Sequence, residues 1–492
     1  RHCECGEYDM KHKVVFKSIG TVLCIEAASM LPSLIVALIN HEKAAIAFAL
    51  TIGIVAVIGA ALLRLKTPKT RIFTRDGFAI VSLSWILVTL FGALPFLLSG
   101  SIPSFIDALF ETASGFSTTG ASILRNVEAL PKSLLFWRSS THWLGGMGIL
   151  VLMIAILPST ASTINIMIAE SPGPSPGKLV PKIRETAKIL YIIYIAMTAV
   201  LVVLLLLGGM PLFDALIHAF GTASTGGFSS RNASVGAYYS VYIDVVITVF
   251  LFLFGVNFTL YYYLFLKRDF KSVLRDEELR FYFGVVIGAI VLIALNIKGT
   301  VYQTIGEAIR YASFQVTSII STAGFATADF NLWPSFSKII LVLLMLTGSC
   351  AGSTAGGIKC VRIVLLLKII RREITRLIHP NAVQPVKLNG RRVDEETLSG
   401  VMAFFFFWML IIAVSVLIVS LDGKDLVTST TAVLATVNNV GPGLGAVGPT
   451  GNFADFSALS KTVMSLCMLI GRLEVYPIML LCFPSFWKRS SI

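Results

Sequence analysis

Residues 106–122 and 213–229 read IDALFETASGFSTTGAS and FDALIHAFGTASTGGFS, and they are two copies of one pattern. When Gly120 is aligned with Gly227, the Asp-Ala-Leu near the start of each copy falls in the same register. Two more diverged copies, YASFQVTSIISTAGFA and TSTTAVLATVNNVGPG, align through Gly324 and Gly441. The pattern recurs about every 100 residues, and an internal repeat of this kind has to be recognised before a fold is assigned.

The chain around these copies is too apolar for a soluble protein. Hydrophobic residues make up 55% of its 492 residues and charged residues 14%, with a mean hydropathy of +0.82, whereas soluble chains are about 25% charged. Apolar runs of roughly 20 residues predict membrane-spanning helices. Ten such runs lie near 16–39, 44–63, 77–98, 136–158, 189–208, 245–266, 281–297, 339–370, 397–421 and 462–487.

Each copy of the pattern lies between two apolar runs, in a semi-apolar segment that is unusual for a solvent loop. We therefore expect each unit to contain an outgoing helix, a short helix that dips back into the membrane, a glycine-rich turn and a returning helix. Because every unit begins and ends on the same side, the repeats are parallel and surround an axis along the membrane normal. The expected fold is all-α, with four such units around a central pore, a two-helix N-terminal hairpin, about ten membrane helices and four pore helices.

The expected division of the chain follows from this repeat. It comprises a tail at 1–13, a hairpin at 14–66, and repeats at 67–169, 170–270, 271–380 and 381–492.

The distribution of charge predicts the orientation. If the N-terminus is cytoplasmic, 29 of the 40 Lys and Arg residues lie in inner segments, against only 14 of the 27 Asp and Glu residues. This asymmetry places both termini in the cytoplasm. It also accounts for the net charge of +13 without nucleic acid, although segment 359–396 is basic enough to contact membrane lipid or an acidic partner.

Two other features carry little information about the fold. The seven cysteines contain no Cys-x-x-Cys pair and predict neither a disulfide framework nor a zinc site. Cys3 and Cys5 belong to a polar start that lacks an initiator Met, which we set aside from the fold. Glu26 lies within the first apolar run, and the sequence offers no role for it.

The glycine-rich turns suggest what passes along the axis. We name them strips 1 to 4, for residues 118–122, 225–229, 322–326 and 439–443; they contain small residues and no carboxylate or base. Rings of backbone carbonyls that replace a hydration shell select potassium, and the C-terminal ends of the short helices favour a cation. The residues expected to bind potassium are Thr118, Thr119, Gly120, Thr225, Gly226, Gly227, Thr322, Ala323, Gly324, Asn439, Val440 and Gly441.

Short motifs then connect the chain with a known family. The sequences at 141–148, 224–229 (STGGFS), 321–327 (STAGFAT), 438–445 (NNVGPGLG) and 471–474 (GRLE) carry the resemblance. Over about residues 14–487 the chain resembles the Trk/Ktr/HKT superfamily of potassium transporters, in particular its TrkH type. The strips likewise resemble the potassium-channel pattern Thr-Val-Gly-Tyr-Gly, most closely in strip 3.

The resemblance implies a function and partners. It implies potassium uptake through a channel-like pore in the cytoplasmic (inner) membrane of a prokaryote, with K⁺ as the transported ion, no enzymatic activity and no nucleotide bound by this chain. It also implies a homodimer gated by a cytoplasmic, nucleotide-binding TrkA-type subunit. Sodium-preferring plant relatives carry serine where this chain has Gly120, so the resemblance implies potassium over sodium.

The eighth apolar run contains a candidate gate. Residues 348–357 read GSCAGSTAGG, and glycine is unfavourable in a helix interior, so we expect the helix to break there. The resemblance implies an intramembrane loop that obstructs the pore and moves on gating; close packing of small residues between helices is the alternative. The gate residues expected in this loop are Gly348, Gly352, Gly356 and Gly357.

Arg472, in the tenth run, is the remaining gate candidate. A charge within the membrane is energetically unfavourable and usually functional, but Glu474 is only two residues away and would not face the same side of a helix. The resemblance implies that Arg472 projects toward the pore, where it repels cations or holds the loop. A structural ion pair with another helix is the alternative.

Several other signals have simpler explanations. Residues 443–448 match a dinucleotide motif and 352–359 resemble a phosphate loop, but neither follows a strand. His142 and His218 are single histidines for which packing is favoured over metal or proton chemistry. Two interpretations remain open for four carboxylates. They could create a field that attracts cations at the pore mouth, or they could belong to a solvated rim; they are Asp107, Glu111, Asp214 and Glu307.

Two rival functions make different demands on the sequence. A proton- or sodium-coupled transporter of another solute predicts inverted repeats and midplane carboxylates. A membrane enzyme needs clustered Asp, His or Glu near one membrane face. The acidic residues outside the strips are scattered along the chain, which favours neither rival.

Overall fold

The computed structural model describes residues 12–66, 74–148, 183–381 and 384–487. The regular secondary structure of this part of the chain is helical apart from one pair of two-residue strands, β1 (Lys387–Leu388) and β2 (Arg391–Arg392). Six of its helical segments are long and apolar enough to cross a membrane, and a bent pair makes a seventh. The architecture is all-α, as predicted.

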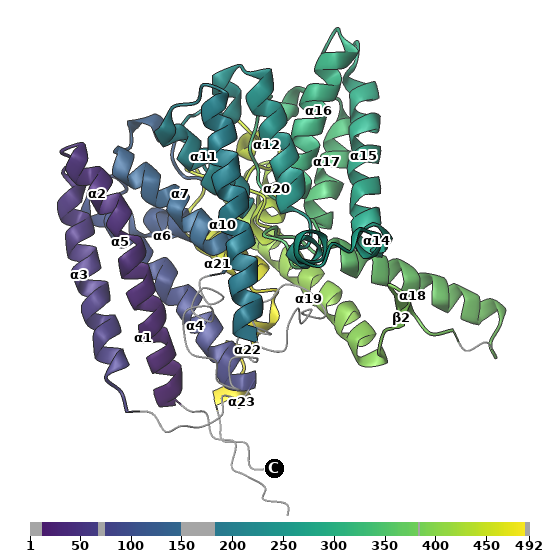
Figure 1. The fold of residues 1–492 in the computed structure, drawn as a ribbon, viewed down its shortest axis with the longest axis horizontal. Helices are drawn as coiled ribbons and strands as arrows, with labels where there is room; N and C mark the ends of the chain where they lie inside the picture. Colours follow the sequence, from purple (N-terminus) through teal and green to yellow (C-terminus); the bar gives the residue numbers. More distant parts are fainter. Residues whose placement is uncertain (1–11, 67–73, 149–182, 382–383, 488–492) are drawn as a thin grey trace, which may run out of the picture.

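The N-terminal hairpin consists of α1 (His12–Ser29) and its continuation α2 (Leu31–Ile39), followed by α3 (Ala44–Leu63). It lies at one edge of the molecule, in purple in Figure 1. Glycines let the two helices approach closely, since a Cβ on Gly20 would lie 2.9 Å from the carbonyl oxygen of Gly59. Small residues are the usual contact between membrane helices because they allow backbones to pack together.

Four long helices lead toward the short ones. They are α4 (Thr74–Gly92), which continues into α5 (Leu94–Leu98), α10 (Ile183–Leu207), α15 (Glu277–Ile297) and α19 (Glu395–Val419). The short helices that follow are α6 (Phe105–Phe116), α11 (Leu212–Ser224), α16 (Ile305–Ile320) and α20 (Leu426–Val437).

Three of the four short helices begin with strong capping signals. Ser104 and Asp425 each accept a hydrogen bond from a backbone N–H of the first turn, and Thr304 forms a capping box with Glu307. With 12 to 16 residues, these helices are too short to cross a membrane of about 30 Å. They are the predicted half-helices, and each ends directly before a strip.

The returning helices are short. They are α7 (Lys132–Gly146), α12 (Val241–Phe254), α17 (Ser335–Thr347) and α21 (Ala458–Arg472). The predicted break after α17 is confirmed, because residues 348–359 separate it from α18 (Cys360–Ile378). The end of the expected span at 136–158 lies outside the described residues.

Two spans that we predicted as continuous, 245–266 and 462–487, are also broken, so these predictions were wrong. After α12 the chain turns by 96° into α13 (Phe258–Tyr261) and a π-helical turn (Tyr262–Leu266), with Asn257 capping the new helix. After α21, Glu474 and Val475 both have positive φ, and the next helix, α22 (Tyr476–Leu481), has Pro477 in its first turn. Capping and proline signals end these helices although the hydropathy continues.

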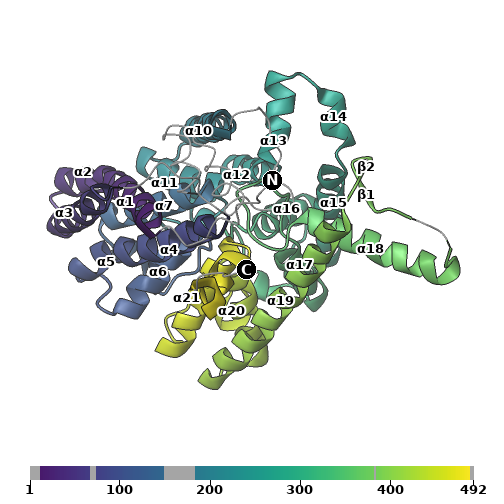
Figure 2. The same cartoon turned by 90° about the horizontal axis from the view of Figure 1, so that it is seen from below.

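The helices are arranged around one centre. Seen from below, α4–α7, α10–α12, α15–α17 and α19–α21 follow one another around it, and α1–α3 lie outside the first group (Figure 2). Helix α18 projects away from the body, next to the β1–β2 hairpin. Segments from four distant parts of the chain therefore meet in the middle of the molecule.

Candidate functional site

The four strips begin with the same unusual backbone conformation. Their first residues have φ values of 58°, 54°, 60° and 56°, a left-handed region that residues other than glycine seldom adopt. The residues concerned are Thr118, Thr225, Thr322 and Asn439.

Hydrogen bonds explain this conformation. In strip 1, the N–H of Thr119 donates to Ser114 O at 2.9 Å and the N–H of Thr118 donates to Gly115 O at 3.1 Å. These two bonds are the Schellman motif, which ends a helix by placing one residue in the left-handed region. The same pair of bonds occurs at the ends of α11, α16 and α20. Each short helix thus directs its last carbonyls, the negative end of its dipole, toward the strips.

The glycines of the strips close a ring. The glycines through which the four copies align are the anchor glycines. At each of them a Cβ would lie less than 3 Å from the backbone of the next strip, so glycine alone fits. The approach runs from Gly120 to strip 2, from Gly227 to strip 3, from Gly324 to strip 4 and from Gly441 back to strip 1. The four strips are therefore neighbours in chain order, and the fourth meets the first.

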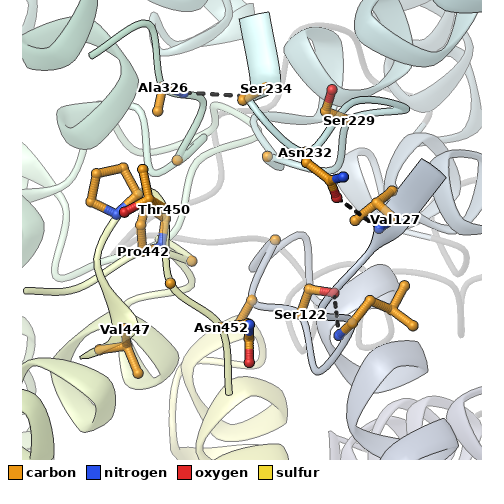
Figure 3. A pocket seen from close by; sticks show the side chains of 18 of the residues that line it. Ser122, Val127, Ser229, Asn232, Ser234, Ala326, Pro442, Val447, Thr450 and Asn452 are labelled. Carbon is orange, nitrogen blue, oxygen red and sulfur yellow. Dashed lines mark hydrogen bonds between the residues drawn. The ribbon is translucent and has the colours of Figure 1, made fainter. Parts of the chain in front are cut away.

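A cavity of about 140 Å³ lies against one side of the ring. The four anchor glycines line it, together with Ser122, Ser229 and Asn232, as Figure 3 shows for the labelled side chains. Neighbouring segments are linked around it, because Val127 N donates to Asn232 Oδ1 at 2.8 Å and Ala326 N donates to Ser234 Oγ at 3.3 Å. We call this cavity the vestibule.

The four carboxylates considered for the pore mouth are engaged in other contacts. Glu111 is buried and forms an ion pair with Arg138, and Asp107 forms one with Lys461 at 2.7 Å. Asp214 accepts from Ser230 Oγ at 2.6 Å and lies 3.4 Å from Arg231 Nη2, and Glu307 caps α16. Because Glu111, Asp107 and Asp214 are paired with basic side chains, they do not give an unscreened field that attracts cations. Because Glu111 and Asp214 are buried, they do not belong to a solvated rim.

The two histidines pack against strips, and packing is the role that the sequence predicted for them. His142 Nδ1 lies 2.6 Å from Gly115 O and its ring stacks on Phe228 of strip 2 at 4.1 Å. His218 lies 2.9 Å from Ser229 Oγ and stacks on Phe325 of strip 3 at 5.7 Å. Within the described ranges, no group of three or more His, Cys, Asp or Glu residues is placed to hold a metal ion.

On the other side of the ring lies the loop of residues 348–359. Gly356 N donates to Thr322 Oγ1 of strip 3 at 2.7 Å, and Thr225 Oγ1 of strip 2 donates to Thr354 Oγ1 at 3.3 Å. A Cβ on Gly356 would lie 2.5 Å from Asn438 O, directly before strip 4. Three of the expected gate glycines, Gly348, Gly352 and Gly357, have positive φ, which shows why this segment cannot continue as a helix.

Arg472 completes the contact between loop and strips. Its guanidinium donates to Thr118 Oγ1 of strip 1 at 3.3 Å and to Thr354 O of the loop at 2.7 Å. It also donates to Gly145 O and Gly146 O at the end of α7, at 2.5 and 2.6 Å. Glu474 pairs instead with Arg362 of α18, so the two neighbouring charges do not form a pair, as their spacing predicted.

The other sequence motifs keep their simpler explanations. Residues 443–448 form a turn after strip 4, in which Gly443 N donates to Val447 O at 2.7 Å. Residues 352–359 belong to the loop. No described strand leads directly into either motif, because the described strands lie at 387–392 and helices α19 and α20 separate them from residue 443.

Sequence reasoning missed the pairing of Glu111 with Arg138. One signal was available, because Glu111 and His218 occupy the same position relative to the glycines of strips 1 and 2. Both reach the serine that follows the glycine by two residues, Ser122 and Ser229. Extending the register of the repeat would have identified these two residues as supports of the strips.

Comparisons with known proteins agree with this geometry. The TrkH family model, described as a cation transport protein, matches residues 43–489. The chain is 39% identical to the Trk system potassium uptake protein TrkH of Escherichia coli (strain K12) over 485 residues, which is 98% of this chain and 100% of that protein. It is 34% identical to TrkG of the same strain over 480 residues, covering 97% and 99%. The crystal structure of the potassium transporter TrkH from Vibrio parahaemolyticus superposes with a TM-score of 0.87, at 36% identity, over 97% of this chain and 100% of that one.

Proposed function

Because the chain belongs to the TrkH family of cation transport proteins, we propose that it takes up potassium across the cytoplasmic membrane through the ring formed by strips 1 to 4. The observation that carries this proposal is the closure of the ring by four glycines. A ring of backbone from four equivalent segments can offer carbonyl oxygens to an ion from all sides. The proposed potassium ligands are the first three residues of each strip.

The loop and Arg472 are proposed as the gate of this path. The loop contacts strips 2, 3 and 4, and Arg472 joins it to strip 1. An arginine below a cation path opposes the passage of cations through its charge. Movement of the loop and of Arg472 together would open the path.

Partners and orientation belong to the same proposal. Relatives are named as parts of a Trk system, which supports a cytoplasmic, nucleotide-binding TrkA-type regulatory subunit. Helix α18 projects from the body (Figure 2) with five apolar side chains more than half exposed, which supports a homodimer in which that face is covered. These side chains are Leu367, Ile370, Ile374, Leu377 and Ile378.

The excess of basic residues in the inner segments supports cytoplasmic termini. The proposed division of the chain into six parts follows the repeat.

Gly120→Ser tests the ring. A Cβ at Gly120 would lie 2.7 Å from Gly227 N, and φ there is 81°, so a side chain displaces strip 1 from strip 2. We expect the preference for potassium over sodium, measured as rubidium and sodium flux into liposomes, to fall about tenfold. The matched control is Gly288→Ser, at a position with nothing within 4 Å. Unchanged flux and preference in Gly120→Ser would contradict the assignment of the ring.

Shortening the loop tests the gate. Removal of residues from 350–356 breaks the contacts with Thr225 and Thr322, and we expect basal flux to rise in the absence of any partner. Basal flux equal to that of the parent would exclude the loop as the obstruction.

A further inference from the structure

Strip 1 is held by a carboxylate from its own short helix. Glu111 accepts from Ser122 Oγ at 3.0 Å and from Ile123 N at 3.0 Å, so it fixes the strip just beyond its glycine. The side chain of Glu111 is fully buried. A buried carboxylate needs a cationic or hydrogen-bonding partner, since an unpaired charge is strongly unfavourable there.

Arg138 of α7 provides that partner and also reaches strip 2. Its Nε lies 2.5 Å from Glu111 Oε1, and its Nη1 donates to Ser229 O at 3.2 Å. The guanidinium lies over the ring of Phe228, 3.5 Å from the centroid. The planar fork of an arginine suits such simultaneous contacts, which a lysine would not reproduce.

His142 holds the same strip one turn later along α7. Phe228 N donates to His142 Nε2 at 3.3 Å, so Nε2 is the unprotonated nitrogen and Nδ1 donates to Gly115 O. Phe228 is thus enclosed between the guanidinium of Arg138 and the imidazole of His142. Strip 2 is fastened to α7 and, through Glu111, to strip 1.

We propose that Glu111, Arg138 and His142 form a brace that sets the spacing between strips 1 and 2, and that ion selectivity depends on it. The three are positioning residues, because the ion would meet the strips and not the brace. The inference rests on the proposed function. A carbonyl ring discriminates between ions through the positions of its oxygens, which the surrounding contacts must hold. Because Glu111 and Arg138 neutralise each other, the brace does so without adding net charge beside the vestibule.

Two of the three remaining junctions of the ring are held differently. Between strips 2 and 3, His218 stacks on Phe325 at 5.7 Å. Between strips 4 and 1, Asn439 Nδ2 donates to Thr119 Oγ1 at 3.0 Å, and Phe453 N donates to Ser122 O at 2.8 Å. Of these three junctions, as far as the described residues show, the brace has a buried ion pair in contact with the backbone of a strip, so its removal is expected to disturb one side of the ring.

A double variant isolates this role. Glu111→Gln with Arg138→Met removes both charges together, so no unpaired charge remains buried and folding is preserved. The glutamine can still accept from Ser122, but the contact with Ser229 O is lost. We expect the ratio of rubidium to sodium flux in liposomes to fall about tenfold, the size expected for loss of one charged hydrogen bond.

The matched control is Asp244→Asn with Arg310→Met. Asp244 and Arg310 form an ion pair at 2.6 Å between α12 and α16, with side chains 5% and 23% exposed. We expect the control to keep the flux ratio of the parent. His142→Phe, which retains a ring beside Phe228 but removes both hydrogen bonds, is expected to give a smaller fall of about threefold.

Melting temperatures in potassium and in sodium chloride give a second measurement that does not require transport. An ion that binds the folded state stabilises it, so potassium should stabilise the parent more than sodium does, and the double variant should lose most of this difference. An unchanged flux ratio in the double variant, or an equal fall in the control, overturns the brace. If the parent shows no rubidium flux, the proposed function is contradicted. In that case the melting temperatures still test the brace: a double variant that loses the potassium-specific stabilisation supports it, and a double variant that keeps this stabilisation overturns it.

Discussion

Two arginines lie on opposite sides of the ring of strips, and their partners differ. On the vestibule side, Arg138 is paired with a buried carboxylate, Glu111. On the side of the loop, Arg472 donates to a hydroxyl and to three carbonyl oxygens. The contacts of Arg138 connect strips 1 and 2, whereas those of Arg472 connect strip 1 with the loop and with the end of α7. The same side-chain type thus positions the strips on one side of the ring and joins the loop to them on the other.

The backbone on the two sides also differs in how it is held. The strips approach one another so closely at their glycines that no side chain fits between them. The loop contacts strips 2 and 3 through hydrogen bonds of Thr354 and Gly356, and it approaches the backbone directly before strip 4 closely at Gly356 alone among its described glycines. Hydrogen bonds can be exchanged at a modest net cost, whereas a close backbone contact admits no alternative packing. We therefore expect changes in the ring to abolish transport and changes in the loop to release it.

The largest effect is expected from Gly324→Ala, in the ring. Its Cβ would collide with the carbonyl of Val440, and φ at this position is 76°. Left-handed strain together with the clash costs several kcal/mol, so potassium flux should fall about 100-fold or more. Gly284→Ala, in α15 with nothing within 4 Å, is the control. Flux near that of the parent in Gly324→Ala would remove the distinction between a rigid ring and a movable loop.

An intermediate effect of opposite sign is expected from Arg472→Gln. The change removes the charge and weakens the contact with Thr354 O, and we expect basal rubidium flux to rise about tenfold. Arg472→Lys keeps the charge but cannot reach strip 1, the loop and α7 at once. If basal flux rises in Arg472→Gln alone, the effect is due to the charge. If it rises equally in Arg472→Gln and Arg472→Lys, the effect is due to the contacts. No rise in either variant would exclude Arg472 from the gate.

The smallest effect is expected from Glu474→Gln. Glu474 pairs with Arg362 of α18, just beyond the loop, and Arg362 also donates to Ile358 O at 3.2 Å. Because this second bond remains, the loop should be loosened only slightly and basal flux should rise about twofold, less than in Arg472→Gln. Asp422→Asn, at the far end of α19 beside Ser457, is a carboxylate control that should not change flux. A rise in Glu474→Gln as large as in Arg472→Gln would place the main restraint of the loop at its base.

Much of the fold was predictable because it follows from local properties. Hydropathy identified the long helices, and the recurrence of Gly120, Gly227, Gly324 and Gly441 identified the strips. The breaks after α12 and α21 were missed because hydropathy continues across them, although Asn257 and Pro477 mark the positions. Capping residues end a helix whether or not the chain stays apolar.

The sequence by itself determined the repeated unit, the positions of the strips and the break in the eighth apolar run, because these depend on residue type and spacing along the chain. Only the tertiary structure decided that the strips close in chain order, that Glu111 and Arg138 are partners, and that Arg362 is the partner of Glu474. The physical reason is that a buried charge or a close backbone contact depends on whichever groups surround it in the folded chain. Those groups come from other helices, at separations that no local pattern records.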